Sequence, residues 1–140
     1  MNGMFQNTFS LTGLDLSSFN TSLVTSMQSM FFGASNLTTL DLSSFNTSAV
    51  TDMTAMFWNA SNLTSLDLSN FDTSAVTLMS SMFSGATALT ALNTTNWDTD
   101  PLPTSAGWIS GMTGTIYCND PDSGGTGATG TGTVNGETCY

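Results

Sequence analysis

The sequence of 140 residues contains no lysine, arginine or histidine, although its acidic residues give it a formal charge of −10. Binding of nucleic acid requires basic side chains that neutralise phosphates, so that class of function is excluded. An anionic membrane surface is disfavoured as a partner for the same reason. Because salt bridges to Lys or Arg are also excluded, apolar burial and hydrogen bonds must stabilise the fold.

Long apolar runs are missing too. A membrane-spanning helix needs an apolar stretch of at least about 18 residues. No stretch of the sequence approaches that length, so no transmembrane segment is expected. The N-terminus lacks the basic region and the continuous apolar region of a signal peptide, so an export signal would have to lie outside this sequence. With 39% hydrophobic and 10% aromatic residues, the chain is too apolar for a disordered polymer, and its length suits one domain.

The missing residue types also restrict catalysis and metal binding. Without His, Lys or Arg, a serine or cysteine nucleophile has no conventional base, and the sequence predicts no enzyme and no cofactor. Paired carboxylates remain, but they recur as repeat columns, which are more often structural than catalytic. The two cysteines stand without histidine and without Cys-x-x-Cys spacing, so no metal site is expected.

What the sequence does contain is one phrase in several copies. Met-x-x-Met-Phe motifs and Leu-Asp-Leu triplets recur at one unbroken interval, the motifs starting at Met1, Met27, Met53 and Met79 and the triplets at Leu14, Leu40 and Leu66. Leu92-Asn93 is a fourth, degraded copy of the triplet. A fixed interval without insertions indicates a solenoid, in which each unit buries its apolar face against its neighbours.

Within one unit the apolar spacing changes character. Leu37, Leu40, Leu42 and Phe45 follow an L-x-x-L-x-L-x-x-F pattern whose centre alternates as a strand does. The following "SSFNTS" favours a turn.

The second half of the unit predicts a short helix over residues 50–60. There the apolar side chains share one helical face, with Thr51 as N-cap. Gly33, Asn59 and Gly85 stand where a left-handed residue would end each helix. We therefore expect an α/β fold, a right-handed leucine-rich-repeat-type solenoid of about four 26-residue turns.

The pattern breaks after Trp97, which divides the chain into a solenoid (1–98), a capping segment (99–114) and a Gly/Thr-rich tail (115–140). Prolines in the capping segment should take it out of the stack and over its open end. In the tail, residues 115–118 predict a short strand and Asn135-Gly136 predicts a hairpin. We expect a disulfide between Cys118 and Cys139, since exported chains use cysteine in this way; the alternative is two free thiols in a reducing cytosol.

The repeat also carries a resemblance. The phrases "LDLSSFNTSAVTDMTAMF" and "GASNLTTLDLSSF" make residues 1 to about 98 similar to the BspA-like leucine-rich repeats of bacterial, mycoplasma-type and protist surface proteins. The resemblance implies an extracellular or cell-surface location. It also implies protein or matrix binding, and no catalytic activity.

One repeat column suggests a binding surface. The middle residue of an L-x-L strand faces away from the core, so Asp15, Asp41 and Asp67 should project together, with Asn93 ending the acidic row. Neighbouring strands lie about 4.8 Å apart, and two charges there repel by about 1 kcal/mol even in water. The row predicts a basic partner. The alternative is that nearby Ser and Thr groups satisfy these carboxylates locally and that the column is structural.

Other columns support competing interpretations. The methionines could recruit Cu(I), but their position among Val and Phe favours core packing. Two threonine columns suggest ice binding if they form a flat polar array: Thr21, Thr47, Thr73 and Thr99, and Thr25, Thr51 and Thr77. The first unit lacks its strand and turn, which suggests either further repeats upstream or a homo-oligomer that stacks end to end into fibres.

Overall fold

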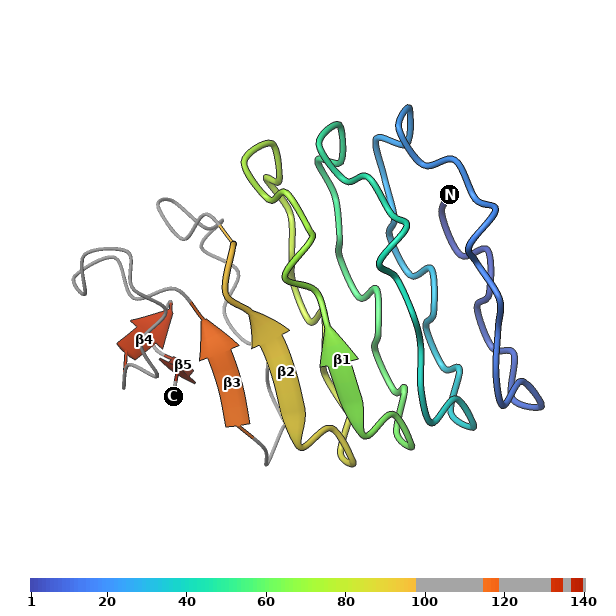
Figure 1. Cartoon of the computed structure of the whole chain (residues 1–140). Helices are drawn as coiled ribbons and strands as arrows, with labels where there is room; N and C mark the ends of the chain where they lie inside the picture. Colours follow the sequence, from blue (N-terminus) through green and yellow to red (C-terminus); the bar gives the residue numbers. More distant parts are fainter. Residues whose placement is uncertain (98–114, 119–131, 135–136, 140) are drawn as a thin grey trace.

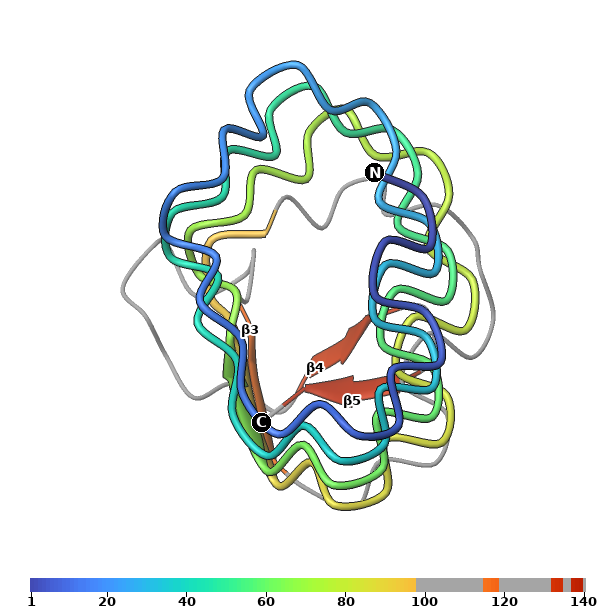
Figure 2. The same ribbon diagram turned by 90° about the vertical axis from the view of Figure 1, so that its right-hand side faces the viewer.

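The computed structural model describes residues 1–97, 115–118, 132–134 and 137–139. In Figure 1, successive passages of the chain lie side by side, and residues 26 apart are neighbours that share hydrogen bonds. We call each passage a coil: residues 1–26, 27–52, 53–78 and 79–97. Figure 2, which looks along the stack, shows the coils superimposed, with the strands of the parallel sheet on one long side and an undulating segment on the opposite side.

One side of the stack is a short parallel sheet. It consists of β1 (Ser65–Asp67), β2 (Ala91–Thr94) and β3 (Thr115–Cys118), in that order. In the register, Leu66 pairs with Leu92, and Leu92 pairs with Ile116. The strand expected at 115–118 is therefore present, but it extends the sheet of the repeats, whereas the sequence had assigned it to the tail.

The two remaining strands form a hairpin. β4 (Gly132–Val134) and β5 (Glu137–Cys139) pair antiparallel, with Val134 opposite Glu137. Their connection is Asn135-Gly136, the two residues from which the sequence predicted a hairpin. The side chains of Cys118 and Cys139 lie outside the described part of the structure, so the disulfide remains a prediction.

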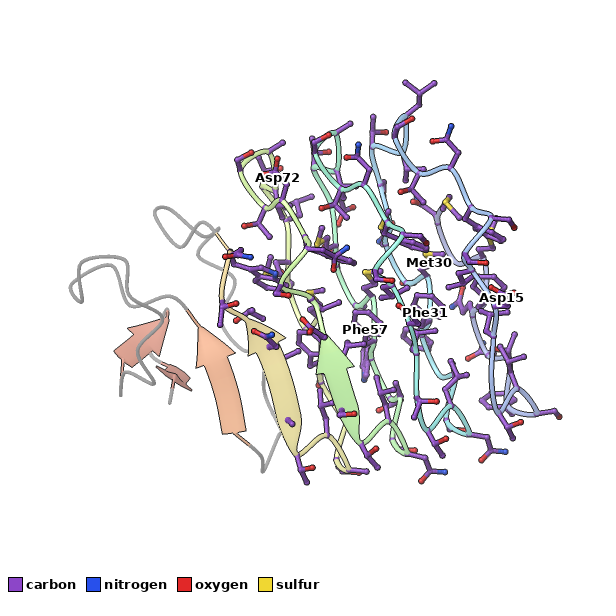
Figure 3. All side chains as sticks on the ribbon, in the orientation of Figure 1. Asp15, Met30, Phe31, Phe57 and Asp72 are labelled. Carbon is purple, nitrogen blue, oxygen red and sulfur yellow. The ribbon has the colours of Figure 1, made fainter. Side chains whose placement is uncertain are left out.

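The core lies between the two long sides and is built from repeat columns. The methionines of coils 2 to 4 are at most 1% exposed, so they pack in the core as expected. The rings of Phe5, Phe31, Phe57 and Phe83 stack along the coils with centroids 5.2–5.5 Å apart and nearly parallel planes. Figure 3 shows Phe31 and Phe57 inside the stack. Each coil therefore buries its apolar face against the next, as the repeat predicted.

The helix expected over residues 50–60 is replaced by a run of turns, and no helix occurs among the described residues. In a helix every N–H bonds to the carbonyl four residues back. Here alternate N–H groups bond outside the coil: those of Ala55, Phe57 and Asn59 donate to carbonyls of the next coil over 2.8–2.9 Å. The intervening Met56, Trp58 and Ala60 donate three residues back. We call residues 1–8, 27–34, 53–60 and 79–86 the turn segments.

Left-handed residues explain this geometry. Positive φ recurs in two columns of the turn segments, one formed by Gly3, Ser29, Ala55 and Ser81 and the other by Asn7, Gly33, Asn59 and Gly85. Each segment is therefore two four-residue blocks with a left-handed residue in third place. The sequence identified the Asn/Gly column as left-handed, although it placed these residues at helix ends. Ser and Ala gave no such signal in the other column, because they seldom adopt this conformation.

Candidate functional site

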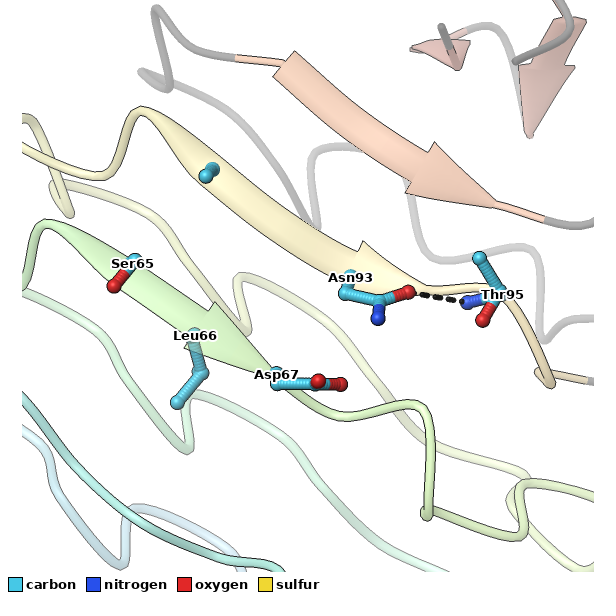
Figure 4. Close-up of a pocket in the computed structure, with 6 residues that line it drawn as sticks. Ser65, Leu66, Asp67, Asn93 and Thr95 are labelled. Carbon is cyan, nitrogen blue, oxygen red and sulfur yellow. Dashed lines mark hydrogen bonds between the residues drawn. The ribbon is translucent and has the colours of Figure 1, made fainter.

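The aspartate column lies where the sequence placed it. Asp15, Asp41 and Asp67 are exposed on the strand side, and Asn93 is partly buried. Asp67 in β1 and Asn93 in β2 are paired in the register of the sheet. Figure 4 shows their side chains next to each other on the outer face. The structure therefore brings these polar side chains into one row, with one member from each coil.

Each member of the row also makes a local hydrogen bond. The N–H of Ser17 donates to Oδ1 of Asp15 over 3.0 Å, and the N–H groups of Ser43 and Ser69 do the same for Asp41 and Asp67 over 2.9 Å. In the fourth coil, the N–H of Thr95 donates to Oδ1 of Asn93 over 3.2 Å. Every carboxylate of the row thus closes the turn that follows it in the chain. These bonds confirm that nearby serines satisfy part of each carboxylate, as the alternative interpretation of the column predicted. The carboxylates nevertheless remain exposed to solvent.

These hydrogen bonds keep the row charged. The side-chain and backbone bonds from Ser17 lower the pKa of Asp15, and the backbone and side-chain bonds from Ser43 lower the pKa of Asp41. The pKa of Asp67 is lowered mainly by Ser69, with a smaller contribution from Asn93. Asp15 raises the pKa of Asp41 by repulsion, but as the weakest contribution. The row is therefore fully ionised at neutral pH.

Open hollows lie along the row between neighbouring coils. One of about 400 Å³ is bordered by Ser65, Leu66, Asp67, Ala91, Asn93 and Thr95 (Figure 4). A second of about 540 Å³ lies between Asp41 and Asp67. The row offers carboxylate oxygens beside small apolar and hydroxyl groups. Such a surface suits a cationic group.

A second column of turn-closing residues lies in the turn that "SSFNTS" predicted. The N–H groups of Ser22, Ser48 and Ser74 donate to Oδ1 of Asn20, Asn46 and Asp72 over 3.0–3.1 Å. The side-chain and backbone bonds from Ser74 lower the pKa of Asp72. Figure 3 places Asp72 at the tip of its coil, away from Asp15. The repeated Asn-Thr-Ser and Asp-Thr-Ser motifs place one such turn in each of the first three coils.

The structure corrects half of the threonine array. Thr21, Thr47 and Thr73 are buried, not exposed. The hydroxyl of Thr47 donates to the carbonyl of Asp72 over 2.9 Å and accepts the N–H of Asp72 over 2.8 Å. The hydroxyl of Thr21 makes the same two hydrogen bonds with the carbonyl and the N–H of Asn46. Burial is possible because both capacities of the hydroxyl are used between coils. Thr99 lies outside the described residues.

The second threonine column stays exposed. The hydroxyls of Thr51 and Thr77 donate to the carbonyls of Thr25 and Thr51, both over 3.1 Å. Of the two threonine columns that were expected on the surface, this one alone is exposed among the described residues. Among the described residues, no group of three acidic or cysteine side chains is placed to hold a metal ion. The same residues form no helix that is long and apolar enough to cross a membrane.

These observations define a repeat protein whose coils are joined by hydrogen bonds and by stacked side chains. The chain belongs to the family described as "Mycoplasma protein of unknown function, DUF285", whose family model matches residues 1–115. That family is related to the BspA-like repeat proteins that the sequence resembles. No curated protein and no solved structure was found to match the chain.

Proposed function

We propose that this chain is an extracellular or cell-surface binding module without catalytic activity, built on a right-handed solenoid of the BspA-like leucine-rich-repeat type. The family match over residues 1–115 supports the relation to such surface proteins. The stacked 26-residue coils support the solenoid. The observation that carries the binding role is the row of exposed, ionised carboxylates of Asp15, Asp41 and Asp67.

The partner proposed for this row is a basic protein surface. Like charges repeated along neighbouring coils repel one another, and a cationic partner relieves that repulsion. The chain has no Lys or Arg of its own to do so. Because these carboxylates are exposed, salt should weaken the association strongly.

A matched pair of variants tests the role of the row. The variant D41N/D67N removes two charges from the row, whereas D52N/D72N removes two charges elsewhere. Asp52 and Asp72 also accept an N–H from two residues ahead, over 2.8 and 3.0 Å, so both variants alter the same kind of turn. With a lysine-rich peptide as probe, titrated at low and high salt, we expect D41N/D67N to weaken binding several-fold more than D52N/D72N. Equal losses in the two variants would assign the binding to net charge alone.

Ice binding and end-to-end fibres are the alternatives to a binding module. The burial of Thr21, Thr47 and Thr73 counts against ice binding, because it removes one of the two columns. The half-exposed Met4 and Phe9 of the first coil are the observation behind the fibre alternative. Thermal hysteresis and negative-stain microscopy distinguish these alternatives from the binding module, for which neither activity is expected.

A further inference from the structure

The hydrogen bonds between turn segments all run in one direction. The N–H groups of Gly3, Phe5 and Asn7 in coil 1 donate to the carbonyls of Gln28, Met30 and Phe32 in coil 2, over 2.7–2.9 Å. Coil 2 repeats this pattern toward coil 3, and coil 3 toward coil 4. An ordinary parallel β-ladder exposes both N–H and C=O groups at each edge. Between turn segments, N–H groups instead donate only to the following coil, and C=O groups accept only from the preceding coil.

The turn segment of the first coil therefore has an edge that consists of acceptors. The carbonyls of Asn2, Met4 and Gln6 occupy the positions that accept in the later coils, and none receives a hydrogen bond from the residues that the structure describes. The Phe5 ring stacks on Phe31 with one face, and it is only partly buried. Met4 is 50% exposed and Phe9 58%. The edge combines a row of acceptors with an incomplete apolar layer.

We propose that this edge is a docking surface for one further coil of the same 26-residue repeat, presented in the same orientation as the coils within the chain. Such a coil sends alternate N–H groups forward, so it supplies a donor for each of the three carbonyls. Its phenyl ring continues the stack of Phe5, and its core side chains cover Met4. The interface would repeat the one that already joins coils 1 and 2, coils 2 and 3, and coils 3 and 4.

The direction of the hydrogen bonds between turn segments disfavours a second copy placed face to face on this edge. Two such edges would put carbonyl opposite carbonyl, which leaves acceptors unsatisfied at a cost of about 1–3 kcal/mol for each buried group. A second copy placed head to tail is disfavoured as well. Its last repeat strand, β2, already pairs with β3, and the offset from Leu92 to Ile116 is shorter than the repeat offset from Leu66 to Leu92. The fitting partner is a repeat coil whose N–H side is free.

Duplication of one coil tests the proposal in the full chain. Residues 27–52 are added directly before Met1, where they stay in register because Asp52 precedes a methionine of the same column in the native sequence. We expect Tm to rise by about 5 °C or more, since each added coil contributes an interface. In the added coil, the amides at the positions of Ser29, Phe31 and Gly33 should be protected from hydrogen exchange, because these columns donate to the columns of Asn2, Met4 and Gln6. The control carries the same added segment in scrambled order and should give neither effect.

A gain as large with the scrambled segment, or no gain with the duplicated coil, would overturn the proposal. A second measurement does not depend on folding of the extended chain. In an M4C variant, a two-fold symmetric face-to-face dimer centred on the row of carbonyls would place the two new thiols together and give a disulfide-linked dimer on a non-reducing gel. We expect no more dimer from M4C than from the unmodified chain. A rapid M4C dimer would show that the edge pairs with itself and would contradict the inferred direction.

Discussion

The side-chain oxygen of Asn59 lies in the space that a Cβ atom at residue 85 would occupy. The same relation holds one pair of coils earlier, where Oδ1 of Asn7 lies 2.6 Å from the Cβ position of Gly33. Both glycines have positive φ, of 67° at Gly33 and 77° at Gly85. Glycine in coils 2 and 4 thus serves two purposes, because it permits the left-handed backbone and leaves room for the asparagine of the preceding coil.

The first prediction concerns this pair. G85A should lower the free energy of unfolding by about 2 kcal/mol, because a left-handed alanine is strained and its Cβ displaces the Asn59 side chain. In an N59G background the clash is gone and only the backbone strain remains. We therefore expect a coupling of about 1 kcal/mol in a double-mutant cycle measured by urea denaturation. Strictly additive effects would show that the two side-chain positions are independent.

The second prediction concerns the buried threonines. T47V should cost about 2 kcal/mol of stability, because it leaves the partly buried N–H and C=O of Asp72 without their partner. T47S keeps the hydroxyl and should cost about 1 kcal/mol, for the lost methyl group. T51V is the control, since Thr51 is exposed, and it should change stability by about 0.5 kcal/mol or less. Equal losses of unfolding free energy for T47V and T51V in guanidinium would show that the two bonds of the Thr47 hydroxyl to Asp72 do not stabilise the fold.

The third prediction concerns the ring stack. Phe57 lies between Phe31 and Phe83, with centroids 5.5 and 5.2 Å away, and it is fully buried. F57A should cost about 3–5 kcal/mol and F57L less, since leucine fills part of the cavity. The matched control is F9A, at a phenylalanine that is 58% exposed, with an expected change below about 1 kcal/mol. Thermal unfolding followed by near-UV circular dichroism measures all three. A small effect of F57A would show that the stack is not a main source of stability.

The fourth prediction concerns acid. The pKa values of Asp15, Asp41 and Asp67 are lowered in the folded chain, so the unfolded state takes up protons first as the pH falls. The stability that these groups provide is complete above the ordinary pKa of 3.8 and is lost as the pH falls through the lower folded values. Between pH 5 and pH 3, Tm should fall less in D15N/D41N/D67N than in the unmodified chain. Parallel curves would exclude this contribution.

The fifth prediction concerns the two cysteines. β3 and β5 carry Cys118 and Cys139 and lie in contact with each other. A bridge between them closes a loop of about 20 residues and should stabilise the tail by about 3 kcal/mol on the chain-entropy model. Intact mass under non-reducing conditions should be lower by two hydrogen atoms than after reduction. Alkylation of both thiols without prior reduction would contradict the bridge and weaken the extracellular assignment.

The sequence predicted the repeat and its core columns because their spacing needs no knowledge of the backbone. Met27, Met30, Phe31 and Ala34 are all buried, as the periodicity required. Their spacing of three, four and seven residues fits a helical face. It equally fits two four-residue blocks that each turn one face inward. Over eight residues the two patterns are indistinguishable, and the positive φ of Ser29 and Ala55 decides between them.

The candidate site was predictable in position but not in its bonding. Alternation in a strand was enough to place Asp41 on the surface. The bond from the N–H of Ser43 depends on the backbone direction after the strand, which Leu-Asp-Leu-Ser does not specify. Thr47 was assigned to the surface for a related reason. Its flanking Asn46 and Ser48 indicate a turn, and only the neighbouring coil shows that its hydroxyl is consumed internally.

The alternation of asparagine and glycine along Asn7, Gly33, Asn59 and Gly85 constrains how repeat number can change during evolution. Removal of coil 2 alone would set Asn7 against Asn59, whose Cβ would meet the side chain above it. Removal of coils 2 and 3 together would set Asn7 against Gly85 and restore a compatible neighbour. Recombination within such a gene should therefore be tolerated most readily when it gains or loses coils in pairs, so paralogues of different length should differ by an even number of repeats.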